Sequence, residues 1–309
     1  IAVLIPCYNE EATISTVIAD FKRELPEADI YVYDNNSTDR TYELAVQGGA
    51  IVKKEPRQGK GNVIRQMFFD IDADYYLMVD GDDTYPAEAV HGLLEKLRSG
   101  EADMVIGDRL SNGTYFDENK RPFHDFGNNL VRNTITRMYK TKILDVMTGY
   151  RGFNRIFVKS FPIMSSGFQI ETELTIHALD KKFKFVEIPI DYRDRPEGSE
   201  SKLNTFSDGF KVIMMIIKMF KDYKPLLFFG IWTIFFFLFG LVTGIPVIRE
   251  YMLTSFITRI PSAILSTGLM TLALLSLVTG LILDTVVTNA KKEYELNLYH
   301  VYHEYHSRK

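Results

Sequence analysis

Three carboxylates crowd into residues 80–83, where Asp80, Asp82 and Asp83 surround Gly81. They follow an apolar run, residues 75–79, and a buried strand that delivers acids at its carboxyl end is typical of ligand sites in open α/β sheets. Carboxylates this close repel one another unless a cation lies between them, and hard oxygen ligands favour Mg²⁺ or Mn²⁺. We therefore predict a divalent metal on Asp80 and Asp82, with a diphosphate as its companion. A solvated acidic turn is the alternative.

Strand-like and helix-like segments alternate on both sides of this motif. The strand-like segments are residues 1–5, 29–33, 50–52, 75–79 and 102–106, and the helix-like segments between them are residues 10–25, 39–47, 60–70 and 86–98. Such alternation predicts an α/β domain with a mostly parallel sheet and helices on both of its faces.

The loops that follow the first two predicted strands carry polar groups suited to a nucleoside. They read Pro6-Cys7-Tyr8-Asn9-Glu10 and Asp34-Asn35-Asn36-Ser37-Thr38-Asp39, and both offer hydrogen-bond acceptors and helix-capping groups. Neither is Gly-x-Gly-x-x-Gly, which counts against a dinucleotide site. Gly59-Lys60-Gly61 lacks the remainder of a Walker A loop, but it either presents a lysine and backbone amides to a phosphate or simply begins a helix.

Composition narrows the class of protein. The chain has 309 residues, enough for one sizeable domain and an appendage, and its net charge of −4 argues against a nucleic-acid partner. Its single cysteine, Cys7, excludes an intramolecular disulfide and fits a reducing compartment.

Two long uncharged runs follow the predicted α/β domain. Leu226–Ile248 would form a helix about 34 Å long, enough to cross a bilayer, and Ile260–Leu283 is a second run of similar length. The segment Arg249–Arg259 between them is too short for a domain, so we predict a transmembrane hairpin. A pair of buried core helices is the alternative.

Lysines flank this hairpin on one side. They are Lys211, Lys218, Lys221, Lys224, Lys291 and Lys292, whereas the loop carries only Arg249 and Arg259. The positive-inside rule places the large domain and the tail in the cytoplasm, at the cell membrane. Phe206–Tyr223 mixes apolar residues with lysines, as in an interfacial helix, and Tyr294–His306 is expected to be a short polar helix. The expected division is 1–204 catalytic, 205–224 juxtamembrane, 225–285 transmembrane and 286–309 cytoplasmic tail.

Six segments in order resemble the family 2 glycosyltransferases. Four are the motifs above, at Pro6–Glu11, Asp34–Asp39, Gly59–Gly61 and Asp80–Asp82. Asp145–Arg155 resembles that family's acceptor-side motif, and Arg195–Leu203 resembles a segment of its dolichol-phosphate mannose synthase-like branch. The resemblance covers residues 1–204. With the hairpin added, the chain resembles a bacterial polyprenyl-phosphate glycosyltransferase.

This resemblance implies a GT-A-type domain that moves a sugar, with inversion, from a UDP- or GDP-linked donor to undecaprenyl or dolichyl phosphate at the cytoplasmic membrane face. It assigns catalysis to Asp145 and Asp82, with Asp145 either a base or a group that orients Arg151 or the acceptor. Arg109 follows the end of a predicted strand and can point into the site, so we expect it to bind the acceptor phosphate together with Arg121, whose assignment rests mainly on the resemblance. The residues implied for the nucleotide sugar are Pro6, Tyr8, Glu10, Asp34, Lys60, Asp80, Gly81, Arg195 and Lys202. Residues 194–202 would form a lid over the diphosphate, or a solvated linker.

Two departures from the family pattern leave the donor open. The commoner Asp-Asp-Gly-Ser is here Asp34-Asn35-Asn36-Ser37, and Thr84 stands where mannose synthases often have glutamine. A membrane-tethered transferase with a non-polyprenyl acceptor and a non-catalytic membrane scaffold remain alternative readings, and a homo-oligomer is left open. A processive synthase is disfavoured because the only tryptophan, Trp232, lies inside the first apolar run, so a Gln-x-x-Arg-Trp motif is impossible.

Overall fold

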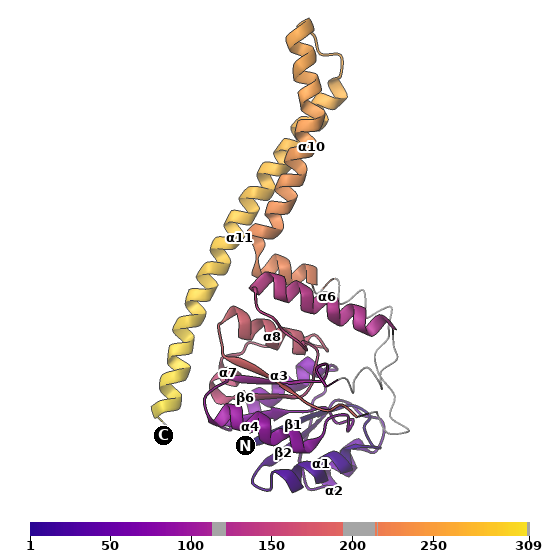
Figure 1. Ribbon diagram of the computed structural model, residues 1–309, viewed down its shortest axis with the longest axis vertical. Coiled ribbons are helices and arrows are strands. Elements are labelled where there is room, and N and C mark those ends of the chain that lie inside the picture. Colours follow the sequence, from indigo (N-terminus) through magenta and orange to yellow (C-terminus); the bar gives the residue numbers. More distant parts are fainter. Residues whose placement is uncertain (113–121, 194–213, 215, 308–309) are drawn as a thin grey trace. The chain divides into compact units, whose positions relative to one another are not determined.

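The computed structural model describes residues 1–112, 122–193, 214 and 216–307 (Figure 1). The chain divides into two compact units, residues 1–212 with 297–309, and residues 213–296. We call the first the α/β unit and the second the helical unit, and describe each by itself.

One sheet organises the α/β unit. Within the described residues it has seven strands: β1 (Ala2–Cys7), β2 (Asp29–Asp34), β3 (Ile51–Lys54), β4 (Tyr75–Met78), β5 (Met104–Asp108), β6 (Arg151–Asn154) and β7 (Phe185–Pro189). Their order across the sheet is β3-β2-β1-β4-β6-β5-β7. β6 runs antiparallel to both neighbours and the other pairings are parallel, which confirms the predicted mostly parallel sheet.

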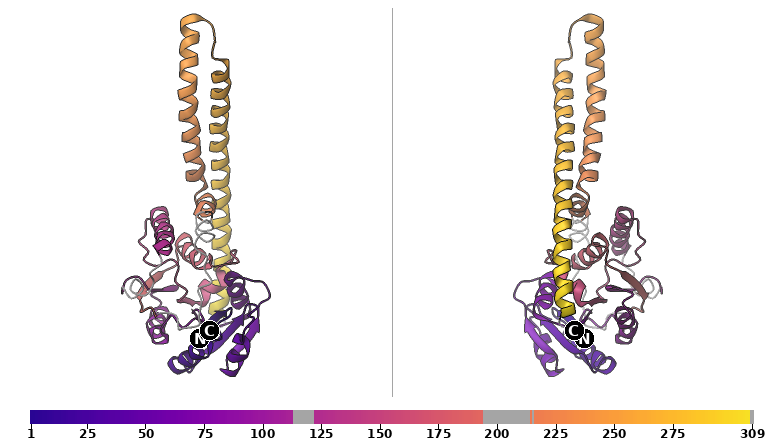
Figure 2. Two further views of the ribbon diagram at one scale, coloured as in Figure 1. Left: turned by 90° about the vertical axis from the view of Figure 1, so that its right-hand side faces the viewer. Right: turned by 90° about the vertical axis from the view of Figure 1, so that its left-hand side faces the viewer.

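Helices cover both faces of this sheet (Figures 1 and 2). In chain order they are α1 (Ile14–Glu24), α2 (Thr41–Gln47), α3 (Lys60–Asp70), the short η1 (Ala87–Ala89), α4 (Val90–Arg98), α6 (Pro122–Tyr139), α7 (Arg155–Ser160) and α8 (Ile170–Asp180). The first four predicted helices are thus present, although α1 begins later than expected because Glu10–Thr13 form turns.

The two faces of the sheet follow directly from the alternation of side chains along its strands. In β1, Val3, Ile5 and Cys7 pack with residues of α1 and α4, whereas Ala2 and Leu4 pack with residues of α3, α7 and α8. The sheet therefore has a buried apolar layer on each side.

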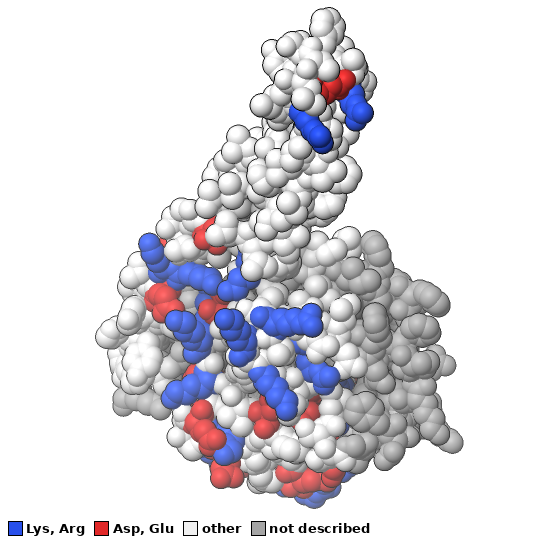
Figure 3. All heavy atoms as spheres, turned by 45° about the horizontal axis from the view of Figure 1, so that its top comes forward, with Lys and Arg blue, Asp and Glu red and all other residues white. Residues whose placement is uncertain are grey.

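The helical unit contains a hairpin of two helices, α10 (Pro225–Thr254) and α11 (Ile260–Ser307), the second of which continues into the α/β unit. Both are long and apolar enough to cross a membrane. Small residues bring them together: the Ser266 hydroxyl donates to the Gly240 carbonyl at 2.9 Å, and a Cβ at Gly244 would lie 2.4 Å from Ser266 Oγ. Figure 3 shows the hairpin surface almost without charged side chains except near its tip.

Helix boundaries in this region differ from the expected ones. α10 extends past the predicted span to Thr254, so that Arg249 lies in the helix. α11 runs without interruption to Ser307, so the polar tail is a continuation of the second apolar helix and not a separate one. The physical reason is that no glycine or proline follows Gly280 to stop the helix. Of the predicted interfacial helix, residues 216–223 are helical and the part before residue 214 lies outside the described residues.

Candidate active site

The loops that follow β1, β2 and β4 meet at the carboxyl edge of the sheet. Residues at the ends of β1 and β2 pair side by side, and the backbone N–H of Asn9 donates to Ser37 Oγ at 2.9 Å. The Thr13 hydroxyl donates to the Gly81 carbonyl at 2.6 Å, which links the loop after β1 to the acidic motif after β4. The structure thus brings together three segments that the sequence places far apart.

The residues expected to contact the nucleoside lie at this edge of the sheet and differ in their burial and hydrogen bonding. Pro6 is half-buried at the end of β1, and Tyr8 is exposed. The backbone N–H of Glu10 donates to Thr41 Oγ1 at 2.7 Å. Asp34 is buried and accepts a hydrogen bond from the backbone N–H of Ser37 at 3.3 Å, so it stabilises the turn in which it lies.

Asn35 explains one departure from the family pattern. Its side-chain amide donates to the carbonyls of Glu55 and Arg57, at 2.8 Å each, and its Oδ1 accepts from the backbone N–H of Gly59 at 2.6 Å. An ionised aspartate here could accept but not donate, so it would leave both carbonyls without this partner. Asparagine therefore attaches the loop after β2 to the segment that contains Lys60.

Lys60 lies between two carboxylates. Its ammonium group contacts Asp80 Oδ1, and it lies 2.6 Å from Glu171 Oε1 at the start of α8. Burial would lower the pKa of Lys60, but the two carboxylates outweigh this effect and hold the pKa above its ordinary value. Burial raises the pKa of Glu171 although Lys60 opposes that shift. Lys60 is therefore a buried, charged group next to the first predicted metal ligand.

The glycines around Lys60 are required by close packing. A Cβ at Gly59 would lie 2.2 Å from the carbonyl oxygen of Ser166, and one at Gly61 would lie 2.1 Å from that of Ser165. Glu173 holds this facing loop, since its carboxylate accepts from the backbone N–H groups of Met164 and Ser165 at 3.0 and 2.9 Å. The Gly-Lys-Gly pattern thus fixes the backbone of the lysine.

The acidic motif itself has oxygen donors of the type that a hard divalent cation takes. Asp80 is the more exposed member, and Asp82 is buried and accepts a hydrogen bond from the Thr84 hydroxyl at 2.7 Å. Within the described part of the chain, no group of three or more His, Cys, Asp or Glu residues is arranged to hold a metal. Mg²⁺ usually binds one or two carboxylates together with substrate phosphates, so the Asp80 and Asp82 pair fits such an ion.

Arg109 and Asp145, predicted for different roles, form one ion pair. Arg109 Nε lies 2.7 Å from Asp145 Oδ2 and Nη2 lies 3.1 Å from Oδ1, a two-pronged arrangement with both side chains buried. Burial would raise the pKa of Asp145, but the Arg109 guanidinium outweighs it and lowers the pKa below its usual value. Asp145 is therefore held as an anion that orients Arg109.

Arg151 does not pair with Asp145. It is fully buried, and it donates to the carbonyls of Thr148 and Val146 at 3.0 and 2.6 Å and to the Thr175 hydroxyl of α8 at 2.8 Å. Burial lowers its pKa to about 10. Arg151 therefore stabilises the loop between Asp145 and β6.

Three predicted site residues, Arg121, Arg195 and Lys202, lie outside the described residues, as does the expected lid at residues 194–202. Glu171, Glu173 and Gly149 also surround the predicted residues. From the sequence, Glu171 and Glu173 could contact sugar hydroxyls or equally cap or solvate a helix, and Gly149 had no role of its own. The only signal available was the pair of acids at the start of α8, which is equally typical of helix capping.

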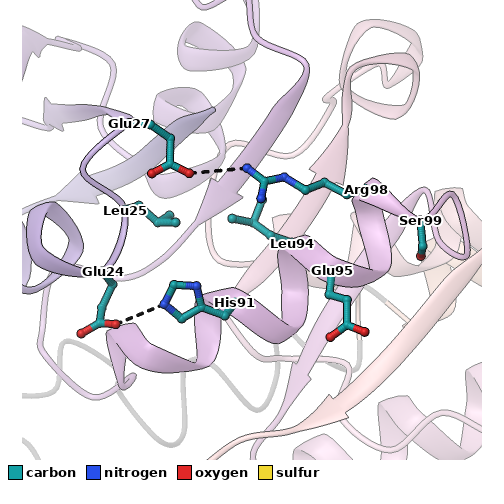
Figure 4. Close-up of a pocket in the computed structure, with 8 residues that line it drawn as sticks. All are labelled: Glu24, Leu25, Glu27, His91, Leu94, Glu95, Arg98 and Ser99. Carbon is teal, nitrogen blue, oxygen red and sulfur yellow. Dashed lines mark hydrogen bonds and ion pairs between the residues drawn. The ribbon is translucent and has the colours of Figure 1, made fainter.

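A pocket of about 570 Å³ lies at the other edge of the sheet, between α1 and α4 (Figure 4). The carboxyl end of α1 and one side of α4 form it, with Glu24 facing His91 and Glu27 facing Arg98. Helices that follow parallel strands end near the strands' amino edge, so this pocket is remote from the acidic motif.

The seven-stranded mixed sheet and the acids after β4 define a GT-A-like α/β domain. The crystal structure of glucosyl-3-phosphoglycerate synthase from Mycobacterium tuberculosis has the same fold, with a TM-score of 0.57 and 21% identity over 70% of this chain and 79% of that one. A family model described as glycosyl transferase family 2 matches residues 2–161. The chain belongs to glycosyl transferase family 2, and it is an enzyme of that family.

Two curated relatives extend this match. Glycosyltransferase AglJ of Haloferax volcanii is 34% identical over 74% of this chain and 75% of its own length. A dolichyl-phosphate hexose transferase of the same organism is 29% identical over 71% of this chain and 93% of its own length.

Proposed function

We propose that this enzyme transfers a sugar from a UDP- or GDP-linked donor to a polyprenyl phosphate, undecaprenyl or dolichyl, with inversion at the anomeric carbon. The observation that supports it most directly is the combination, in one chain, of a family 2 domain and two helices long and apolar enough to cross a membrane. The name of the Haloferax volcanii hexose transferase supports the same acceptor class.

The proposed donor side is the carboxyl edge around Asp80. Pro6, Tyr8, Glu10 and Asp34 would bind the nucleoside, and Lys60 with Gly81 would face the diphosphate, with Arg195 and Lys202 closing over it. A Mg²⁺ or Mn²⁺ ion on Asp80 and Asp82 would supply positive charge to the departing diphosphate. Mycobacterium tuberculosis glucosyl-3-phosphoglycerate synthase has been solved with Mn²⁺ and UDP-glucose.

The proposed acceptor side is the Arg109–Asp145 pair with Arg121. A lipid phosphate is already an anion near neutral pH, so its attack needs positioning more than it needs a strong base. Asp145 fits this requirement because it fixes the orientation of the Arg109 guanidinium, with Nε 2.7 Å from Oδ2, and the positive charge of that group would attract the acceptor anion. We infer that residues 1–204 form the catalytic domain, 205–224 the juxtamembrane segment, 225–285 the membrane hairpin and 286–309 a tail.

The test is direct transfer. Purified full-length enzyme is incubated with radiolabelled UDP- and GDP-sugars, each with and without undecaprenyl or dolichyl phosphate, and lipid is extracted. For the donor that the enzyme uses, we expect label in the lipid fraction, and we expect it only when the lipid phosphate is present. Equal transfer to a water-soluble acceptor would refute the lipid-carrier proposal and favour a membrane-tethered transferase with another acceptor.

A second test concerns orientation. Lys218, Lys221 and Lys224 precede α10 and Lys291 and Lys292 lie beyond the apolar part of α11, so the positive-inside rule favours a cytoplasmic catalytic domain. A reporter that is active only in the cytoplasm, fused after Lys309, should be active. If a reporter that works only outside the cytoplasm is active at the same position, this topology is refuted.

A further inference from the structure

The three charged groups around Lys60 differ in their access to solvent. The side chains of Lys60 and Glu171 are 9% and 6% exposed, whereas that of Asp80 is 28% exposed. A cation that enters from solvent therefore reaches Asp80 more readily than Glu171. Since Asp80 Oδ1 already contacts Lys60, such a cation must compete with the lysine for this carboxylate.

Helix α8 holds both the backbone and the side-chain ammonium group of Lys60. Its first turn supplies Glu171 to the Lys60 ammonium group, and Glu173 to the loop whose carbonyls pack against Gly59 and Gly61. The lysine backbone and the carboxylate that neutralises its side chain are therefore set by the same turn of helix. Lys60 can release Asp80 and still keep a counter-charge in place.

We propose that Glu171 is a positioning residue that retains the buried Lys60 ammonium group when a divalent cation takes over Asp80. The inference rests on the proposed metal-dependent function. Without Glu171, release of Asp80 would leave a buried ammonium group without its carboxylate partner, which is strongly unfavourable. Lys60 would then hold Asp80 more firmly, and the cation would bind less well.

This role makes a prediction that a merely structural role does not. If Glu171 acts by retaining Lys60, its effect on cation binding must disappear once the lysine charge is removed. If Glu171 only stabilises the fold, its substitution should have the same effect with or without that charge. The pair of substitutions Glu171→Gln and Lys60→Met therefore separates the two roles.

The experiment measures Mn²⁺ binding to the purified full chain by the electron paramagnetic resonance signal of the free ion, with and without added UDP or GDP. We expect Glu171→Gln to raise the Kd for Mn²⁺ about tenfold, and to leave the Kd unchanged in the Lys60→Met background. Glu95→Gln is the matched control. Glu95 is exposed on α4, and its substitution removes one negative charge as Glu171→Gln does, so it should leave the Kd unchanged.

Two results would overturn the inference. Suppose that the wild-type enzyme binds Mn²⁺. A change of less than twofold in the Kd on Glu171→Gln, or an equal rise in the wild-type and the Lys60→Met backgrounds, then refutes the role of Glu171 but not the metal site. A wild-type enzyme that binds no Mn²⁺ refutes the proposed metal site as well. Should Glu171→Gln fail to fold, Lys60→Met alone removes the ammonium group that competes for Asp80, and a Kd for Mn²⁺ higher than that of wild type would then refute the inference.

Discussion

The carboxylate of Asp80 packs directly against the α-carbon of Gly149. A Cβ built on Gly149 would lie 2.3 Å from Asp80 Oδ2 and 2.7 Å from its Cγ, and the backbone N–H of Gly149 donates to the Tyr85 hydroxyl at 3.0 Å. The acidic motif after β4 and the loop before β6 are therefore in direct contact, and only glycine fits at position 149 of that loop.

Gly149→Ala should abolish most activity while the protein still folds. The added methyl group must displace the Asp80 carboxylate, which in our proposal holds the divalent cation that faces the diphosphate, so we expect transfer to fall about 100-fold. Gly92→Ala is the control, because its Cβ would meet no atom closer than 3.8 Å and alanine favours the helix by about 0.5–1 kcal/mol. Initial rates and thermal melting of both variants test this, and full activity of Gly149→Ala would contradict it.

The first part of the fold was largely predictable from the sequence because β1, β2 and β4 are apolar runs and each of the strands β1 to β4 is followed by a helix. In β4 the run Tyr75–Met78 ends at the acids, and this pattern alone predicts both the strand and the position of the site at its carboxyl edge. β6 was not predicted from this alternation, since an antiparallel strand between β4 and β5 does not follow from a pattern of parallel units.

From residue patterns alone, the candidate site was predictable for residues on the loops that directly follow strands, whereas Asp145 came from the family resemblance. Glu171 reaches Lys60 from a helix more than a hundred residues further along the chain, and nothing in its local sequence distinguishes it from a helix-capping acid. Likewise, the pairing of Arg109 with Asp145 depends on how β5 and the loop before β6 lie in the folded sheet. Such contacts are set by tertiary packing, which local patterns do not encode.

Asp82→Asn should remove metal-dependent activity with little effect on folding. Asparagine has nearly the same volume and its Oδ1 can still accept from the Thr84 hydroxyl, but it lacks the negative charge that a divalent cation requires. We expect at least a 100-fold loss of transfer and a melting temperature close to that of wild type. Chelation with EDTA should inactivate the wild-type enzyme reversibly, with recovery in Mg²⁺ or Mn²⁺, and activity retained in EDTA would refute the metal assignment.

His177 should make the α/β unit less stable at acid pH. It is buried on α8 among the rings of Phe157, Phe161 and Phe183, and burial lowers its pKa from 6.5 to about 3. Between pH 6.5 and about pH 3, His177 is protonated in the unfolded chain but neutral in the folded chain. The free energy of unfolding therefore decreases as the pH falls through this range. At pH 5 the loss from this group is about 2 kcal/mol.

The matched variant is His177→Phe, which suits the aromatic surroundings and cannot titrate. Free energies of unfolding are measured by denaturant titration at pH 7 and at pH 5. The decrease from pH 7 to pH 5 should be larger for wild type than for the variant, because carboxylates elsewhere titrate equally in both proteins and only wild type has the histidine. Neighbouring charges at Asp180 and Lys181 are unchanged by the substitution. An identical pH dependence of the two proteins would show that His177 does not carry the effect.

The Arg109–Asp145 pair makes the last prediction, which concerns the acceptor. Asp145→Asn keeps the shape of the side chain but cannot hold both prongs of the guanidinium, and Arg109→Lys keeps the charge but loses the fork. If the pair positions a lipid phosphate, both variants should raise the KM for polyprenyl phosphate about tenfold more than the KM for the nucleotide sugar. Because a broken buried ion pair also destabilises, melting temperatures must be measured together with the rates.

Separate titrations of lipid phosphate and nucleotide sugar decide the matter, with Glu95→Gln on α4 as the control for loss of one negative charge remote from the site. Asp145 is fully buried and its pKa is lowered, so a base that takes a proton from the acceptor is the less favourable role for it. A base would show itself as a fall in kcat with little change in either KM. A defect confined to nucleotide-sugar affinity would instead move Arg109 to the donor side and refute its assignment to the acceptor phosphate.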